Sequence, residues 1–242
     1  MKIALIGYGK MGHAIEEIAT KRGHEIVLRI RSGNRHEMTP ENLQNADVAI
    51  EFTNPESARE NVLHVLNTGT PVICGSTGWN EGLDAAKAKA LNKNTAFLQA
   101  SNFSVGVNIF FEVNKLLASL MNDQPDYEVS IEETHHTQKK DAPSGTAITL
   151  AEQVLDNLDR KRHWVKEKAE SADDFPVIAH RIEGVPGTHN VKYSSRIDDI
   201  EIIHTAHNRE GFALGAVLAA EFVAGKKGIF TMQDVLGINK NR

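Results

Sequence analysis

The sequence has a single cysteine, Cys74, among its 242 residues, so no disulfide can form within one chain. One free cysteine suits a reducing compartment, where thiols stay reduced. The chain also lacks any apolar run near the ~20 residues that a membrane-spanning helix needs. It lacks a basic excess, because 27 lysines and arginines face 32 acidic residues and give a net charge of −5. We therefore expect a soluble cytoplasmic protein that binds neither membranes nor nucleic acids.

The rest of the composition is that of a globular protein. Hydrophobic residues make up 40% of the chain, and this length allows one large domain or two small ones with a sizeable core. We find no internal repeat. The apolar N-terminal run meets Gly7 at once, so it is too short for a signal peptide and predicts a first strand.

Strands and helices alternate over the first hundred residues. Apolar runs predict strands at 3–6, 25–30, 47–52, 71–74 and 95–99, and helical spacing predicts helices at 11–22, 55–68 and 81–92. Only short breaks, several of them at glycine, separate these segments. Such alternation is typical of a Rossmann-type parallel sheet of the α/β class.

The pattern changes after about residue 103. Helices are predicted at 106–121, 146–158 and 211–224, and strands at 127–133, 177–183, 189–194 and 199–205. The segment 160–175 is charged and poor in apolar residues, which predicts an exposed connection. Because no helices separate the last three strands, we expect a second, α+β domain with a mostly antiparallel sheet.

A glycine-rich loop lies between the first predicted strand and the first predicted helix, which is the context of a dinucleotide-binding loop. Its first glycine turns the chain, its second lets the backbone approach a pyrophosphate, and its third lets the helix pack on the strand. The alternative is an ordinary glycine turn. We expect the whole loop to bind a nicotinamide cofactor: Gly7, Tyr8, Gly9, Lys10, Met11 and Gly12.

Arg31 stands 19 residues after Gly12, where this fingerprint expects an acid for the ribose hydroxyl. An arginine there can pair with a 2′-phosphate, so we expect NADPH to be used, alone or alongside NADH. The alternative is a solvated arginine at a strand end. Two later strand ends offer small residues and donors to the nicotinamide, unless they are ordinary loops: Gly75-Ser76-Thr77-Gly78 and Ala100-Ser101-Asn102-Phe103.

The loop before the helix at 146–158 gathers two imidazoles, two ammonium groups and a helix start: His135, His136, Lys139, Lys140, Ser144, Gly145 and Thr146. Imidazoles transfer protons near neutral pH, and the ammonium groups and the N–H groups of a helix start attract anions. This composition predicts a pocket for an acidic small molecule, the alternative being a polar surface loop with a capping serine. We expect no metal, because adjacent histidines lack the spacing of a zinc-binding helix. Cys74 is expected to pack in the core.

The string His135-His136-x-x-Lys139-x-Asp141-Ala142-Pro143-Ser144-Gly145-Thr146-Ala147 resembles the signature of the dihydrodipicolinate reductases, also called 4-hydroxy-tetrahydrodipicolinate reductases. The resemblance covers nearly the whole chain and includes the glycine loop and segments 75–78, 102–108, 184–189 and 209–216. It implies a bacterial-type enzyme of lysine and diaminopimelate biosynthesis. Such an enzyme reduces a cyclic dicarboxylate with NADH or NADPH.

The resemblance implies that His135 is the proton donor and that Lys139 is its catalytic partner. It assigns the substrate to His136, Lys140, Ser144, Gly145, Thr146 and Arg209, and the cofactor to residues 7–12, 75–77 and 100–103. Family members are usually homotetramers joined through the sheets of their second domains. We therefore expect 1–103 and 209–242 to form the dinucleotide-binding domain, with 104–208 inserted as a substrate-binding and oligomerisation domain.

Two features depart from the family pattern. The glycine loop is one residue shorter than in many relatives, and Arg31 replaces the acid that follows the second strand, which leaves the cofactor preference open. Two other functions are also weighed. One is another two-domain NAD(P)-dependent oxidoreductase, such as an amino-acid dehydrogenase. The other is a nucleotide-sensing regulator, which would need a DNA-binding or effector element that the sequence does not display.

Overall fold

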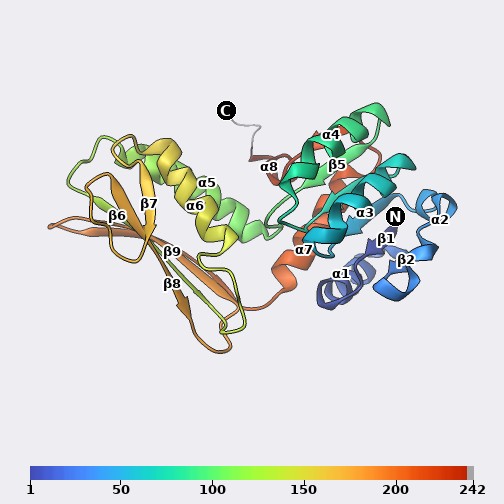
Figure 1. Cartoon of the computed structure of the whole chain (residues 1–242), viewed down its shortest axis with the longest axis horizontal. Helices are drawn as coiled ribbons and strands as arrows, with labels where there is room; N and C mark the ends of the chain where they lie inside the picture. Colours follow the sequence, from blue (N-terminus) through green and yellow to red (C-terminus); the bar gives the residue numbers. More distant parts are fainter. Residues whose placement is uncertain (239–242) are drawn as a thin grey trace. The chain divides into compact units, whose positions relative to one another are not determined.

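The structure is a computed structural model that describes residues 1–238. It contains two compact units. The first comprises Met1–Val105 and the described residues from Arg209 onward, and the second comprises Gly106–Asn208. The chain thus leaves the first unit, forms the second and returns (Figure 1). The last four residues of the expected dinucleotide-binding domain, 239–242, lie outside the described residues.

The first unit is built on a six-stranded parallel sheet with the order β11-β5-β4-β3-β1-β2. Its strands are β1 (Lys2–Ile6), β2 (Glu25–Ile30), β3 (Val48–Glu51), β4 (Val72–Cys74), β5 (Ala96–Gln99) and β11 (Gly228–Phe230). The strand order reverses between β1 and β3. Ligands of such sheets bind beyond the carboxyl ends of the strands at this reversal.

Helices cover both faces of the parallel sheet. One face carries α1 (Lys10–Lys21) and α7 (Glu210–Val223), and the other carries α3 (Pro55–Asn67) and α4 (Leu83–Asn92). Successive strand residues point to opposite faces. Ile3 and Leu5 of β1 therefore join the core under α1 and α7, whereas Ala4 and Ile6 join the core under α3 and α4. Cys74 is fully buried in the second of these cores, as the sequence predicted.

Short elements complete the first unit. They are α2 (Pro40–Gln44), α8 (Met232–Leu236) and the 3₁₀ turns Ser32–Glu37 and Asn80–Gly82. The helical starts follow ordinary capping chemistry. The side chains of Thr39, Asn54 and Thr231 accept hydrogen bonds from the backbone at the beginning of α2, α3 and α8. In contrast, no side chain caps α1.

The second unit has a five-stranded mixed sheet with the order β10-β9-β6-β8-β7. Its strands are β6 (Glu128–His135), β7 (His163–Lys166), β8 (Asp174–Arg181), β9 (Gly187–Ser194) and β10 (Asp199–Ala206). The two long ladders, β10 with β9 and β9 with β6, are antiparallel, while β6 with β8 and β7 with β8 are parallel.

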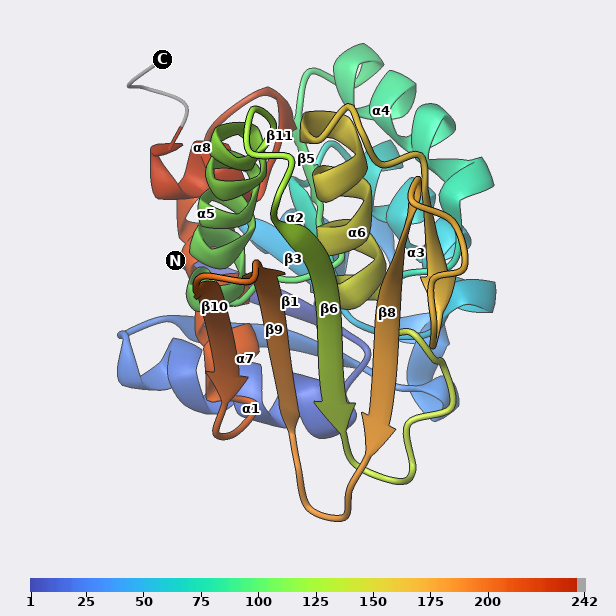
Figure 2. The same cartoon turned by 90° about the vertical axis from the view of Figure 1, so that its left-hand side faces the viewer.

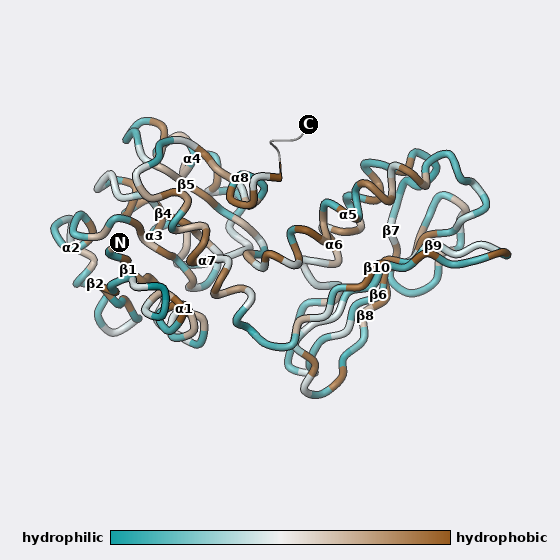
Figure 3. Tube along the Cα trace, turned by 180° about the vertical axis from the view of Figure 1, so that it is seen from behind, coloured by the Kyte–Doolittle hydropathy of each residue, from teal (hydrophilic) through white to brown (hydrophobic). Residues whose placement is uncertain are grey.

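Two helices, α5 (Val105–Met121) and α6 (Gly145–Asn157), cover one face of this second sheet (Figure 2). Figure 3 shows long hydrophobic stretches along both helices. Their apolar residues pack on Val129, Ile131, Val177 and Val191 from three strands. Within Gly106–Asn208, which is described throughout, no helix covers the opposite face, where polar side chains of β6 and β9 alternate with the buried ones.

The predicted fold class is confirmed: a Rossmann-type parallel sheet and a second α+β unit with a mostly antiparallel sheet. The exposed connection expected at 160–175 is wrong, because it contains the edge strand β7 and the first residues of β8. That edge strand is at most half-buried, and its outer residues His163 and Lys166 are exposed. An edge strand with polar ends has no alternation that distinguishes it from a loop.

Candidate functional site

A cleft of about 570 Å³ opens at the carboxyl ends of the strands of the first unit. The loops that follow β1, β3 and β4 all contribute to its lining. The lining residues are Gly9, Lys10, Met11, Phe52, Thr53, Asn54, Pro55, Gly75, Ser76, Thr77 and Arg209. The structure thus brings the glycine loop and the segment 75–77 together, as expected for a dinucleotide-binding fold.

The three glycines of the loop have different surroundings. A Cβ at Gly7, where φ is +98°, would lie 1.9 Å from the carbonyl oxygen of Phe52, and a Cβ at Gly12 would lie 2.5 Å from the carbonyl oxygen of Gly7. Both positions therefore require glycine for packing. Nothing lies within 4 Å of a Cβ at Gly9, which borders the cleft.

The beginning of α1 is suited to an anion. No side chain caps this helix, and its first turn contains no acidic residue. The N–H groups at such a start carry a partial positive charge and bind phosphate groups. The residues present therefore fit the pyrophosphate of a dinucleotide, and Gly9, Lys10 and Met11 line the cleft at this helix start.

Segment 100–103 contributes less to this cleft than the sequence predicted. The side chain of Phe103 is 2% exposed and packs in the core, with its ring 5.6 Å from that of Phe52, so it does not line the cleft. A Cβ at Gly215 of α7 would lie 1.7 Å from the Phe103 carbonyl oxygen, so the helix presses on this backbone. Asn102 is also buried, and its side chain accepts a hydrogen bond from the Ser104 N–H.

A second opening, of about 500 Å³, surrounds the end of β2 and is lined by Arg29, Arg31, Ser32, Gly33 and Asn34. Arg29 forms an ion pair with Glu16 and lowers the pKa of that carboxyl group. The guanidinium group of Arg31 lies over the ring of Tyr8, 4.7 Å from its centre. Arg29 is therefore neutralised by an acid, whereas Arg31 stacks on an uncharged ring.

The sequence interpretation missed the segment that follows β3. Phe52, Thr53, Asn54 and Pro55 line the first cleft, and the Thr53 N–H donates to Ser76 Oγ at 2.8 Å. Before them stands Glu51, which is fully buried and receives a hydrogen bond from the Cys74 thiol at 3.0 Å. The position of this segment after a predicted parallel strand is a signal that could have identified it.

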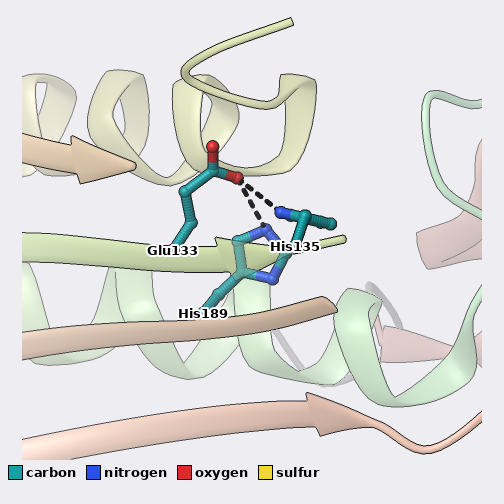
Figure 4. A group of neighbouring side chains, drawn as sticks. All are labelled: Glu133, His135 and His189. Atoms are coloured by element: carbon teal, nitrogen blue, oxygen red, sulfur yellow. Dashed lines mark ion pairs between the residues drawn. The ribbon is translucent and has the colours of Figure 1, made fainter. Parts of the chain in front are cut away.

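In the second unit, two imidazoles and one carboxylate meet (Figure 4). Glu133 and His135 extend from β6, and His189 extends from β9. His135 Nδ1 lies 3.0 Å from Glu133 Oε2, and His189 Nε2 lies 3.7 Å from the same oxygen. All three side chains are buried. Their ligand atoms lie within 4.8 Å of one another, so of the described residues these are the ones that could hold a metal ion.

The Glu133 carboxylate has two further partners. Its Oε1 accepts hydrogen bonds from the Ser144 N–H at 2.9 Å and from Arg181 Nη2 at 3.1 Å. Burial alone would raise the pKa of this carboxyl group, but hydrogen bonds from His135, Ser144 and Arg181 lower it to about 2. Burial lowers the pKa of His189 to about 3, helped by the nearby His135. At neutral pH the cluster therefore contains an ionised Glu133 and an uncharged His189.

The other predicted residues of the second unit lie in the loop after β6 and at the start of α6. Lys139 Nζ pairs with Asp141 Oδ2 at 2.9 Å. Among the remaining residues, Lys140 and Gly145 are exposed, Thr146 is half-buried, and His136 is half-buried with a buried Nδ1 that lacks a partner.

Two predicted substrate residues have a different setting from the one expected. Ser144 is 2% exposed, its hydroxyl accepts a hydrogen bond from the Ala147 N–H as the cap of α6, and the same oxygen lies 3.2 Å from His189 Nε2. The capping serine that the sequence offered as the alternative is thus present. Arg209 precedes α7 and lines the first cleft, among the residues predicted to bind cofactor.

Two family models, for the N-terminal and C-terminal parts of dihydrodipicolinate reductase, match residues 1–103 and 106–236. The chain belongs to the dihydrodipicolinate reductase family. The 4-hydroxy-tetrahydrodipicolinate reductase of Christiangramia forsetii is 50% identical over 98% of both chains. That of Methanoregula boonei is 38% identical over 80% of this chain and 76% of its own.

Solved structures share the fold. A dipicolinate-bound dihydrodipicolinate reductase from Paenisporosarcina sp. TG-14 superposes with a TM-score of 0.78 at 22% identity, covering 97% of this chain and 98% of that one. An amine dehydrogenase from Mycobacterium smegmatis gives 0.64 at 12% identity, covering 96% and 95%. The family membership confirms the resemblance read from the sequence and favours it over an amino-acid dehydrogenase or a regulator.

Proposed function

We propose that the loop from His135 to Thr146 binds and protonates the substrate of this reductase. The chain is an NAD(P)H-dependent oxidoreductase that reduces 4-hydroxy-tetrahydrodipicolinate in lysine and diaminopimelate biosynthesis. The matches to both family models and the 50% identical relative support this activity. When bound, NADH or NADPH supplies the hydride. We assign its pyrophosphate to Gly9, Lys10 and Met11 and its nicotinamide end to residues 75–77, since these segments share one cleft.

His135 is the proton donor in this proposal. The hydroxyl group of the substrate leaves as water, hydride from the cofactor adds to the unsaturated ring, and the resulting electron-rich enamine must gain a proton on carbon. His135 is suited to this step because its Nδ1 lies 3.0 Å from Glu133 and because it ends β6, directly before the loop that contains Lys139 and Lys140.

The positive groups of the loop bind the two carboxylates of the substrate. We assign this role to Gly145 and Thr146, which begin α6, where N–H groups attract anions. His136 and the exposed cation of Lys140, from the loop before this helix, complete the assignment. Lys139 now pairs with Asp141. A substrate carboxylate therefore takes the place of Asp141 when Lys139 binds it, and Lys139 then stabilises the negative charge that develops during the reaction.

The same proposal covers the separate roles of the two units and the assembly of the chain into a tetramer. The first unit binds the cofactor, and the second binds the substrate and joins four copies of the chain through the uncovered face of its sheet. The exposed Ile203 of β10 on that face supports this assembly. A cytoplasmic location follows from the biosynthetic role. No helix within residues 1–238 has the length and apolar character to cross a membrane.

The test is consumption of NADH and NADPH with substrate generated enzymatically in the same reaction. We expect turnover with this substrate and none with simple oxo-acids plus ammonia. His135→Ala and Lys139→Ala are expected to lower kcat by about 10²- to 10⁴-fold, the usual contribution of a positioned acid or cation. His163→Ala, which removes an exposed histidine of the same unit, is the matched control. Wild-type turnover in both variants, with unchanged thermal unfolding, contradicts the assignment.

A further inference from the structure

We propose that Glu133 is the positioning residue of His135: its carboxylate holds Nδ1 of the ring, so that Nε2 is the nitrogen that delivers the proton. Gly187 and His189 enclose the ring from the neighbouring strand. The inference rests on the proposed function, in which His135 is the proton donor. It adds a residue with a distinct task and a distinct experimental signature.

The strand pattern brings the carboxylate and the imidazole together. Glu133 and His135 are two residues apart on β6, so their side chains point to the same face, which also carries the buried Val129 and Ile131. A charged group on this apolar face is costly unless it is paired. Glu133 Oε2 lies 3.0 Å from His135 Nδ1, which makes the imidazole its partner on that side.

The other oxygen of the carboxylate is anchored independently. The Ser144 N–H and Arg181 Nη2 both donate to Glu133 Oε1, at 2.9 and 3.1 Å. The carboxylate is thereby fixed in orientation, with Oε2 3.0 Å from Nδ1 of the ring. An ionised carboxylate has no hydrogen to donate and repels a ring lone pair, so the nitrogen beside it is the one that carries the hydrogen. His135 therefore keeps its hydrogen on Nδ1 and uses Nε2 for the reaction.

The neighbouring strand fixes the ring on its remaining sides. A Cβ at Gly187 would lie 2.9 Å from His135 Nε2, so only glycine leaves room for the ring there. The rings of His135 and His189 meet edge to face, with centres 5.0 Å apart. Gly187 and His189 stand on the same face of β9 as Val191, which places them opposite the buried residues of β6.

Charged and titratable groups surround this pair. Glu133 of β6 and His189 of β9 contact the His135 ring, Arg181 of β8 pairs with Glu133, and Lys139 and His204 lie near His189. Since burial lowers the pKa of His189 to about 3, this second imidazole adds no positive charge at neutral pH. Glu133 is thus the negative charge nearest to the ring of His135.

The experiment compares Glu133→Gln with the matched control Glu132→Gln. Glu132 is the preceding residue on β6, and its half-exposed side chain lies on the opposite face of the sheet. For Glu133→Gln we expect kcat to fall about 10- to 100-fold, the usual cost of losing a group that orients a functional side chain. KM for the substrate and the binding of NADPH are expected to stay within about twofold. Glu133→Asp is expected to recover part of the lost kcat.

The pH profile separates positioning from a purely structural role. The limb of kcat that falls at high pH should move to lower pH in Glu133→Gln, because the variant loses the negative charge 3.0 Å from the ring. A structural role would lower stability and leave this limb in place. An unmoved limb, or a kcat equal to that of the wild type, overturns the inference.

A measurement on the wild-type protein covers the case in which Glu133→Gln fails to fold. Nitrogen-15 NMR of the histidine rings, at a pH where His135 is uncharged, reports which nitrogen carries the hydrogen. We expect Nδ1, and hydrogen on Nε2 overturns the inference. Wild-type protein without turnover contradicts the proposed function itself, whereas an active wild type, an inactive His135→Ala and a fully active Glu133→Gln contradict only this inference.

Discussion

At the scale of single residues, we expect Arg31 to influence the choice between the two nicotinamide cofactors. Its guanidinium group stacks on Tyr8 beside an opening at the end of β2, while the neighbouring Arg29 is occupied by Glu16. We expect Arg31→Ala to raise KM for NADPH about 10- to 100-fold, since a charge-assisted hydrogen bond to phosphate contributes about 1.5–3 kcal/mol. KM for NADH, which lacks the 2′-phosphate, should change little.

Steady-state kinetics with both cofactors measure this effect. Arg35→Ala is the control, because Arg35 is similarly exposed but pairs with Glu60 and does not line the opening. Equal catalytic efficiency with both cofactors before and after Arg31→Ala would leave no role for Arg31 in cofactor choice.

The sequence alone predicted the residues of the candidate site that are adjacent along the chain. The histidines and lysines from 135 to 140 could be read together because they stand in one loop. Glu133, Arg181 and His189 could not be assigned to that group, because their meeting depends on the register of three strands: His135 pairs with Arg181, and Glu133 pairs with His189. The alternation over β6 does place Glu133 on the buried face. A buried acid is unusual, and this was the signal that could have assigned Glu133 to the site.

At the scale of elements, the glycine loop contains a glycine that packing requires, Gly12, and one that packing does not require, Gly9. Gly12→Ala would place a Cβ 2.5 Å from the carbonyl oxygen of Gly7. Since neither backbone can yield cheaply, we expect the free energy of unfolding to fall by about 1–3 kcal/mol, the range for overpacking. Urea unfolding measures this loss.

Gly9→Ala is the matched variant of the same loop. Nothing lies within 4 Å of a Cβ there, so stability should be retained while NADPH affinity falls, because the methyl group occupies the cleft at the start of α1. Equal NADPH affinity in the Gly9→Ala variant and in the wild type would remove the pyrophosphate from this loop.

Elements with a strong hydrophobic pattern were predictable and elements without one were not. Strands β1 to β5 and helices α5, α6 and α7 lie within two or three residues of their predicted bounds, because a fully buried strand or an amphipathic helix has such a pattern. The edge strands β7 and β11 and the five-residue helices α2 and α8 have no such pattern. Their conformation is decided by the neighbours on which they pack, which local sequence does not specify.

At the scale of the whole molecule, stability should depend on acid through the buried cluster of the second unit. The pKa of His189 is lowered from 6.5 to about 3, and that of Glu133 from 4.5 to about 2. In both cases the unfolded chain binds more protons than the folded one, so the free energy of unfolding rises with pH. The contribution of His189 is complete above pH 6.5 and is lost as the pH falls toward 3.

Urea unfolding between pH 7 and pH 4 measures this dependence. The slope contributed by one such group is at most about 1.4 kcal/mol per pH unit. We expect a smaller slope in His189→Asn and an unchanged slope in His163→Asn, whose histidine is exposed. Identical slopes in all three proteins would contradict the linkage to His189.

The proposed tetramer predicts a second property of the whole molecule. Ile203 is 59% exposed on β10, where the neighbouring Ile202 packs inward. A charge at this position would be buried in an interface between sheets, so Ile203→Lys should dissociate the tetramer. Light scattering after size-exclusion chromatography measures the mass, and Leu91→Lys, at an exposed leucine of α4, is the control. A wild type with the mass of one chain, or an Ile203→Lys variant with the mass of four, would contradict the assembly.

The split of the first unit along the chain determines the order in which the protein can fold during synthesis. Helix α7 covers the sheet beside α1, and it is synthesised only after the whole of Gly106–Asn208. The first hundred residues are therefore synthesised first, but one apolar face of their sheet stays partly uncovered until α7 is made. The second unit, continuous in sequence, can complete its fold first, and the partly finished first unit is the species most exposed to aggregation and to chaperones.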